Sequence, residues 1–244
     1  MVNAKKIVIL SLGGSVGKTM LTVQCLYPHM PEARILAVDT ANETARDFGI
    51  KNCELHSGDD FNRTYHALMS TPGDVIVDVG GSKECREFMG GMLAIEGSDE
   101  VTTFIVPSTP SSKDQGCALE TIYRLIDDGV DISKIKVIFT GTRKDTAEEF
   151  EQLIEGMKES GLAPDLNLTI FRSDLFNDMI EGHELIQDIV ADETDYKEKA
   201  TNRKRGDSTD YVEKLIRQKM ARKTVWPNLQ SVYQHLFPHE RQEV

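Results

Sequence analysis

One stretch near the amino terminus has the residue types and spacing needed to hold a chain of phosphates. In chain order its residues are Gly13, Gly14, Ser15, Val16, Gly17, Lys18, Thr19 and, directly after them, Met20. Glycines let the backbone curl so that successive N–H groups point at phosphate oxygens, and a helix that begins there adds positive potential. Lys18 is placed to reach the β- and γ-phosphates, and the Thr19 hydroxyl to bind Mg²⁺. These residues predict a site for ATP and Mg²⁺.

The general pattern for such a loop is G-x-x-x-x-G-K-[ST], and Leu12 stands where its first glycine is expected. The alternative interpretation is a glycine-rich turn between a strand and a helix that contains Gly-Lys-Thr and binds nothing. Two acids further along favour the phosphate site, because Asp39 and Asp78 each close an apolar run. A lone acid at a strand end is usually a cap or turn residue. Two of them after a phosphate loop predict a metal site with Thr19, where each can hold a Mg²⁺-bound water.

Short β-branched runs alternate with longer helical patterns, and these elements must position the loop and the acids. Runs that are apolar throughout suit strands that helices cover on both faces. The expected strands are 7–12, 35–39, 75–79, 103–107, 136–140 and, more weakly, 168–171; the expected helices are 18–29, 60–69, 83–95, 113–128 and 146–160. The alternation predicts an α/β fold with a doubly wound, mainly parallel sheet of the P-loop NTPase type and a helical C-terminal extension.

The character of the chain changes near residue 190, which predicts a nucleotide-binding domain over 1–190 and a basic helical extension over 191–244. Residues 192–210 are charged and poor in apolar anchors, so we expect a mobile connection there. A helix is expected to follow from Tyr211 and to be interrupted at Pro227. The apolar residues after Pro227 recur at helical spacing and form one face. That face is expected to pack onto the body or to dock a partner or a second subunit.

Charge is unevenly distributed over the 244 residues, whose net charge is −12. Residues 197–223 contain ten Lys and Arg against four Asp and Glu, a net +6, which leaves −18 for the rest. An acidic body argues against DNA binding by the whole surface. The basic segment 197–223 is the candidate for direct contact with DNA, and the alternative is a solvated helix that complements the acidic body.

The cysteines and the hydropathy pattern indicate where the chain works. Cys25, Cys53, Cys85 and Cys117 are far apart and contain no C-x-x-C pair, so reduced core thiols are expected. No apolar run approaches the roughly 18 residues of a membrane-spanning helix. The run Ile7–Leu10 is too short for a signal peptide. We therefore expect a cytoplasmic protein without a membrane span.

Three of these stretches together are similar to a known family. Gly-Gly-Ser-Val-Gly-Lys-Thr, Leu-Ala-Val-Asp-Thr and Val-Ile-Val-Asp-Val-Gly-Gly resemble the ParA/MinD family of deviant Walker-A ATPases, over roughly residues 5–145. The segment 105–112 extends the likeness, and the family's use of this stretch implies that Pro107 and Pro110 lie at the adenine end. Within the family, the chain looks most like StbB-type plasmid stability proteins.

Departures from the family pattern concern hydrolysis and dimerisation. Gly13 stands where the family carries a signature lysine that reaches the partner's nucleotide, which puts a nucleotide-dependent homodimer of that kind in doubt. Ala41 stands where the family places an acid that orients the attacking water, and Glu43 is the nearest substitute. The resemblance thus implies catalytic roles for Lys18, Asp39 and Glu43, with slow or partner-dependent hydrolysis.

Recognition of the base is assigned to the end of the strand 136–140. The family places an Asn there and this chain has Thr140, with Arg143 close behind, so both are expected to line the nucleotide site. The segment 142–145 also resembles the guanine-reading N/T-K-x-D motif, with Arg for Lys, which leaves GTP as the alternative to ATP.

The resemblance implies an ATPase of plasmid partition, stability or positioning that acts with a DNA-binding adaptor protein. Two alternatives stay open. A nucleotide-gated scaffold with little hydrolysis fits Gly13 and Ala41. A metabolic enzyme of the same fold, such as a dethiobiotin synthetase, would need polar groups for a second substrate, to which Lys113 and Asp114 could contribute.

Overall fold

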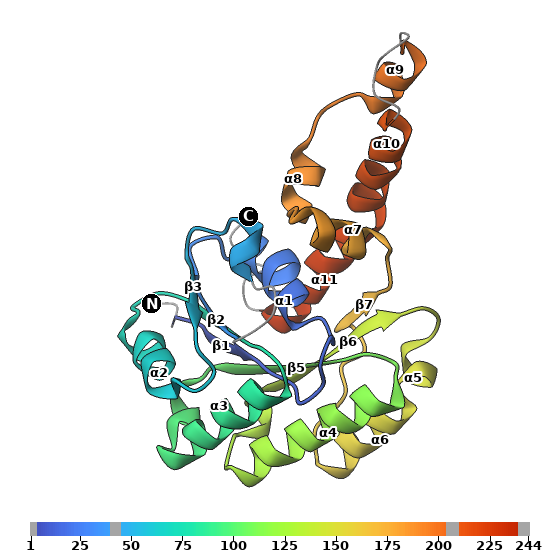
Figure 1. The fold of residues 1–244 in the computed structure, drawn as a ribbon. Coiled ribbons are helices and arrows are strands. Elements are labelled where there is room, and N and C mark those ends of the chain that lie inside the picture. Colours follow the sequence, from blue (N-terminus) through green and yellow to red (C-terminus); the bar gives the residue numbers. More distant parts are fainter. Residues whose placement is uncertain (1–3, 40–44, 204–209, 239–244) are drawn as a thin grey trace.

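The computed structural model describes residues 4–39, 45–203 and 210–238. Its centre is a seven-stranded sheet in the order β3-β2-β4-β1-β5-β6-β7 (Figure 1), and every neighbouring pair is parallel. The strands are β1 (Lys6–Ile9), β2 (Arg34–Val38), β3 (Cys53–His56), β4 (Val75–Val79), β5 (Thr103–Ser108), β6 (Ile135–Thr142) and β7 (Thr169–Phe171). The predicted doubly wound α/β sheet is confirmed.

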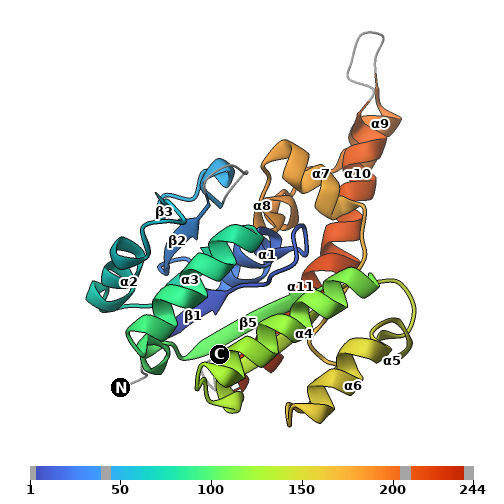
Figure 2. The same cartoon turned by 60° about the horizontal axis from the view of Figure 1, so that its bottom comes forward.

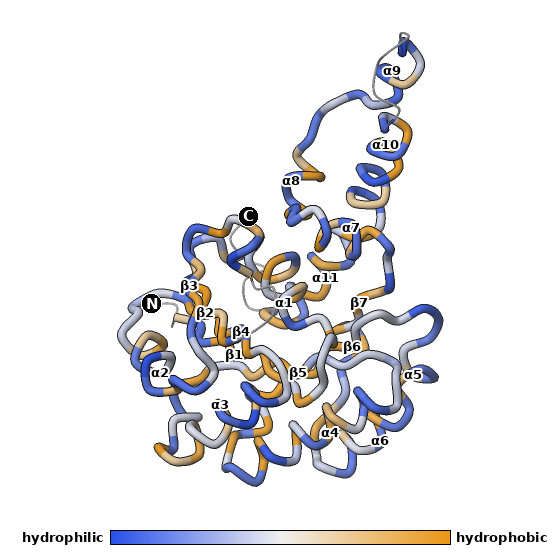
Figure 3. Tube along the Cα trace, viewed as in Figure 1, coloured by the Kyte–Doolittle hydropathy of each residue, from blue (hydrophilic) through white to orange (hydrophobic). Residues whose placement is uncertain are grey.

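The central strands contain continuous apolar runs because both faces of the sheet are covered. In β1, Ile7 and Ile9 belong to one buried cluster, while Val8 and the following Leu10 belong to the cluster on the opposite face. Hydropathy follows the same plan in Figure 3, where the apolar residues gather along the central strands. Burial on both faces therefore explains the continuous apolar runs of the sequence.

Two layers of helices enclose the sheet, as Figures 1 and 2 show from two directions. One layer consists of α2 (Phe61–Ser70), α3 (Ser82–Ala94), α4 (Ser112–Asp127) and α6 (Glu151–Glu159). The other layer begins with α1 (Lys18–Met20), which continues as the π-helical segment η1 (Leu21–Leu26). The later chain adds to it α7 (Leu175–Gly182), α8 (Ile186–Ala191), the π-helical η6 (Ala221–Val225) and α11 (Trp226–Leu236).

Two elements differ from the sequence expectation in the first 160 residues. The edge strand β3 was not predicted, because its Glu54 and Leu55 are both exposed and the strand has no alternating or continuous apolar signal. The helix expected over 146–160 is two helices, α5 (Thr146–Glu149) and α6, because the backbone leaves the helical region at Phe150.

The C-terminal chain differs more. The expected connection 192–210 contains α9 (Tyr196–Thr201), whose first turn is capped by the Asp195 carboxylate at 2.8 Å from the Glu198 amide. The interruption expected at Pro227 is wrong, since the chain stays helical from α10 (Tyr211–Met220) through η6 into α11. Pro227 lies at the start of α11, just after the π-helical η6 within this continuous helical run.

The last helices fall into two parts. We use the word arm for α9 and α10, which pack against each other and project away from the sheet (Figure 1). In contrast, Leu229 and Val232 of α11 are fully buried in the same cluster as Ile7 and Leu21. The domain boundary at residue 190 stays a prediction. In the described ranges, no helix is long and apolar enough to cross a membrane.

Candidate functional site

The loop between β1 and α1 has a curved backbone that neighbouring elements fix in place. Ser15 and Gly17 both have left-handed backbone angles, φ 54° and 89°. The Leu12 amide donates to the Thr121 hydroxyl of α4 at 3.0 Å, and the Gly13 amide donates to the buried Ser11 hydroxyl at 3.2 Å. Left-handed residues in such a loop turn backbone N–H groups toward one side, which makes a concave site for an anion.

Lys18 lies inside this loop. Only 6% of the residue is exposed, and its ammonium group donates to the Gly13 carbonyl at 3.0 Å. Burial lowers the pKa of Lys18, while the nearby carboxylates of Asp78, Asp39 and Glu84 act in the opposite direction. The ammonium group is therefore held over the concave side of the loop, among acids.

The two predicted acids lie at the same edge of the sheet as the loop. Asp78 is in register with Ile9 of β1 and with Ala37 of β2, and Asp39 directly follows β2. Gly80 is necessary for this approach, since a Cβ atom there would lie 2.3 Å from Asp39 Oδ2. The Gly80 amide donates to the Val38 carbonyl at 2.7 Å, which ties the ends of β2 and β4 together.

In the part of the chain that the structure describes, Asp78 is a buried carboxylate with one unpaired oxygen. It is 4% exposed, and its Oδ1 atom has no hydrogen-bond partner among the described residues. Burial raises the pKa of Asp78 to about 6, although the Thr19 hydroxyl and the Lys18 ammonium lower it. Buried carboxylate oxygens are normally paired, so this atom marks a place where a cation or water is expected.

The donor set fits Mg²⁺ bound largely through water. Among the residues that the structure describes, no three His, Cys, Asp or Glu side chains cluster into a ready-made metal site. Mg²⁺ keeps several waters and takes one or two protein oxygens together with phosphate oxygens. Thr19 with the orphaned Asp78 carboxylate, and Asp39 at the same edge, can supply those oxygens.

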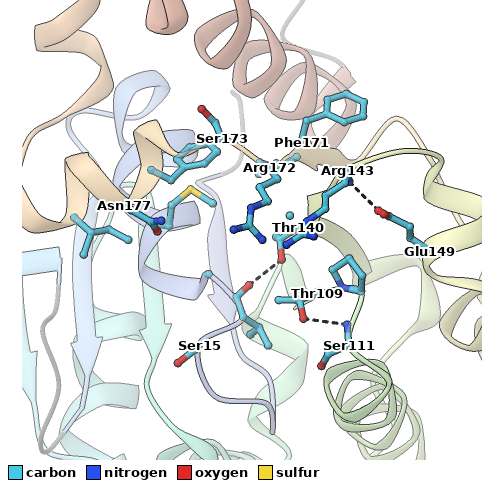
Figure 4. Close-up of a pocket in the computed structure, with 18 residues that line it drawn as sticks. Ser15, Thr109, Ser111, Thr140, Arg143, Glu149, Phe171, Arg172, Ser173 and Asn177 are labelled. Carbon is cyan, nitrogen blue, oxygen red and sulfur yellow. Dashed lines mark hydrogen bonds between the residues drawn. The ribbon is translucent and has the colours of Figure 1, made fainter. Parts of the chain in front are cut away.

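Two adjoining cavities open above this edge. The inner cavity, about 630 Å³, is lined by residues 14–20 of the loop, Asp39, Phe48, Gly80, Gly81, Asn177 and Ile180. The outer cavity, about 570 Å³, lies beside it and is shown in Figure 4. Both are lined by Ser15, Val16, Gly17, Met20, Asn177 and Ile180, so they form one continuous cleft across the loop.

The structure brings most of the predicted base-side residues to the outer cavity. Pro110, Thr140 and Arg143 line it. The Thr140 hydroxyl donates to the carbonyls of Ser108 (2.8 Å) and Val16 (3.1 Å), which fixes the loop to β5 and β6.

Two of the residues predicted to bind the nucleotide do not line the cleft. Pro107 is buried within β5, paired in register with Ile138. Gly13 faces α4, where an added Cβ would lie 2.9 Å from Val16 Cγ1 and 3.4 Å from Asp114 Oδ1. Glu43 and Ala41 lie outside the described residues.

Sequence reasoning missed the residues that follow β7. Arg172, Ser173, Phe176, Asn177 and Ile180 line the outer cavity, and Figure 4 shows Arg172 and Arg143 entering it from neighbouring strand ends. The available signal was the position of this segment. Residues just after a parallel strand share the edge where the phosphate loop lies.

Solved structures with a similar fold include a cell division protein, a ParA family ATPase and an ATP complex of a McdA variant. The MinD cell division protein of Aquifex aeolicus is 17% identical, with 78% of this chain and 90% of that chain covered and a TM-score of 0.55. A ParA family ATPase from Chlorobium tepidum is 14% identical, with 96% and 99% covered and a TM-score of 0.52. The ATP complex of a Cyanothece McdA variant is 16% identical, with 77% and 90% covered and a TM-score of 0.50.

These likenesses confirm the ParA/MinD type of fold that the resemblance implied. No protein-family model and no curated protein sequence matches this chain.

Proposed function

We propose that this chain binds Mg²⁺-ATP in the cleft, hydrolyses it slowly, and acts with a DNA-binding adaptor protein in the partition, stability or positioning of a plasmid. The observation that carries the proposal is the buried, unpaired Asp78 oxygen at the edge where Lys18 and Thr19 begin a helix. A lone Gly-Lys-Thr turn would not require an ionisable group in that position. The fold shared with MinD and a ParA family ATPase supports the same assignment.

Each residue has a defined task in this proposal. The loop amides and Lys18 hold the phosphates, and Lys18 supplies positive charge where negative charge accumulates during phosphoryl transfer. Thr19, Asp39 and Asp78 would hold the metal ion, which neutralises phosphate charge when bound. Pro110, Thr140 and Arg143 line the base end, with Arg172 and Asn177 completing the wall.

Slow hydrolysis follows from what the chain lacks in sequence. Gly13 removes the lysine that would reach a partner's nucleotide, and Ala41 removes the usual acid near the attacking water. Glu43 is our proposed substitute for that acid. A scaffold that binds ATP with hardly any hydrolysis is the nearest alternative, because it has the same binding residues.

The arm is the proposed route to DNA. Lys197, Lys214, Lys219 and Lys223 are exposed on or beside it. Arg217 and Arg222 have structural partners at the base of the arm, so they are less available to phosphates. Lys204 and Arg205 lie outside the described residues.

The test is calorimetric titration of the full chain with Mg²⁺-ATP and Mg²⁺-GTP, followed by measurement of phosphate release with and without duplex DNA. Saturable ATP binding in preference to GTP, with slow turnover, is the expected result. Binding with no measurable turnover under any condition would support the scaffold instead. Absence of nucleotide binding would overturn the assignment.

A further inference from the structure

The turn between α7 and α8 contacts the helix that starts at the phosphate loop. Gln24 of η1 is 1% exposed, and both ends of its amide are used. Its Nε2 donates to the Glu184 carbonyl at 2.9 Å, and its Oε1 accepts from the Ile186 amide at 2.7 Å. A buried side chain bonded twice to one turn transmits displacement of η1 directly to that turn.

The same turn has a second connection to the cleft. The ring of His183 meets Phe48 edge-on, with centroids 5.7 Å apart, and Phe48 lines the inner cavity. The preceding helix α7 places Asn177 and Ile180 in the walls of both cavities. A ligand that fills the cleft therefore contacts both Phe48, which packs against His183 of the turn, and α7, which leads into the turn.

Ion pairs connect the arm to this turn and to α7. Arg217 of α10 donates through Nη2 to the Glu184 carboxylate, and its Nε lies 3.7 Å from Asp178 Oδ2 on α7. The Arg217 side chain is 21% exposed, whereas its partners Glu184 and Asp178 are 42% and 49% exposed, so the guanidinium is the more buried side of these pairs. Glu184 thus holds η1 through its backbone and the arm through its side chain.

We propose that the turn 183–186 couples nucleotide occupancy of the cleft to the attachment of the arm. The proposal rests on the proposed function and names its regulation. The segment η1 that Gln24 belongs to is π-helical, a rare form that is frequent at functional sites. Coupling between sites is reciprocal, so a nucleotide that changes the free energy of arm attachment is itself bound more or less tightly when the arm moves.

Hydrogen exchange of the α10 amides, with and without saturating Mg²⁺-ATP, tests the coupling. In the wild-type chain we expect exchange rates in α10 to change by at least about fivefold, the lower end of ordinary allosteric coupling. In Glu184→Gln, which keeps the size of the side chain and removes its charge, we expect most of this change to disappear. Glu181→Gln is the matched control, because Glu181 is an exposed glutamate on α7.

Arg217→Gln removes the other partner and guards against a variant that only misfolds locally. If one pair carries the coupling, Glu184→Gln combined with Arg217→Gln loses no more of it than either change alone. Unchanged α10 exchange in a wild-type chain that calorimetry shows to bind Mg²⁺-ATP would overturn the coupling alone. A full response retained in Glu184→Gln would overturn it as well, whereas absence of nucleotide binding would overturn both proposals.

Discussion

The phosphate loop and the arm are held in place by different kinds of contact. The loop is surrounded: Ser11 is fully buried before it, Thr121 of α4 binds the Leu12 amide, and Thr140 of β6 binds the Val16 carbonyl. The arm has no buried residue in α9 and only Gln218 buried in α10, while Val212 and Ile216 are 55% and 53% exposed.

The position of the loop is therefore determined by the packing of the whole fold, whereas the position of the arm is determined by a few polar groups. Moving the loop would require rearrangement of its contacts with α4 and β6. At its base the arm is fixed by polar contacts of Arg217 with Glu184 and of Gln218 with Asp192, and Arg222 of the adjoining η6 bonds to Val190 and Asp192. Segments with few buried apolar contacts open at low free energy, so the arm is the part of the molecule that a ligand or partner can reposition.

Replacement of Lys18 should have the largest effect, and it should act on the loop alone. Lys18→Ala removes the ammonium group directed into the loop, so Mg²⁺-ATP affinity should fall by about 3 kcal/mol, roughly a hundredfold or more. Calorimetric titration measures the loss, and circular dichroism should show an unchanged fold. Lys158→Ala, at an exposed position on α6, is the control. Equal affinity in Lys18→Ala and the wild type would contradict the phosphate assignment.

Asp78 provides a prediction with opposite signs for stability and activity. Its pKa is raised to about 6 from 3.8, so the folded chain binds this proton more tightly than the unfolded chain does. The stabilising contribution is complete below about pH 4 and is lost as the pH rises through about 6, a difference of up to about 3 kcal/mol. Without ligands, Asp78→Asn should therefore be more stable than the wild type at pH 7.5.

Urea unfolding at pH 7.5 and pH 4 measures this effect, because the gain should vanish at the lower pH. Mg²⁺-dependent ATP turnover should fall in the same variant, since a carboxamide is a poorer ligand for this cation. Greater stability with undiminished turnover would remove Asp78 from the metal site. A variant less stable than the wild type at pH 7.5 would contradict the buried-carboxylate account.

How far the sequence predicted the fold depends on burial. The central strands were recognisable because both of their faces are buried, so each contains a continuous apolar run such as Ile7–Ile9 or Val75–Val77. The edge strand β3 was missed because half of its residues face solvent and its pairing with β2 is a long-range contact that no local pattern encodes. Pro227 misled because the chain accommodates it just after the π-helical η6, a local change of helix type that the sequence pattern did not indicate.

The candidate site divides in the same way. The loop residues 13–20 are contiguous, so their chemistry is readable directly, and the strand-end rule located Asp39 and Asp78. Phe48, Arg172 and Asn177 come from separate segments that converge only in the folded sheet. Pro107 lies in the predicted segment, but the two-residue period of the strand keeps it within β5 and away from the cleft.

DNA binding by the basic segment 197–223 should weaken as the salt concentration rises. If Arg203, Lys204 and Arg205 each contact a phosphate of duplex DNA, changing all three to Ala should make the slope of log K against log [salt] shallower by about 2.7. Binding to a fluorescent duplex over a salt series measures this slope. An identical weak affinity and slope in the two proteins would contradict DNA contact by the cluster 203–205, and the adaptor would then provide the route to DNA.

The smallest effect is expected from replacing Ser15 of the phosphate loop, and Glu96 of an ordinary turn serves as its comparison. Ser15 and Glu96 both have left-handed backbones, φ 54° and 52°, a conformation that costs a side chain with a Cβ roughly 1 kcal/mol. Ser15→Gly and Glu96→Gly should therefore each raise the free energy of unfolding by up to about 1 kcal/mol, less the added entropy of the unfolded chain.

The two variants should differ in their affinity for Mg²⁺-ATP. Only Ser15 lines the cleft, and a glycine there lets the loop sample more conformations before it binds, so Mg²⁺-ATP affinity should weaken a few-fold in Ser15→Gly alone. Urea midpoints and calorimetric affinities of both variants decide the matter: equal affinities would mean that the loop's curvature is set by its neighbours, with no contribution from the preference of Ser15 itself.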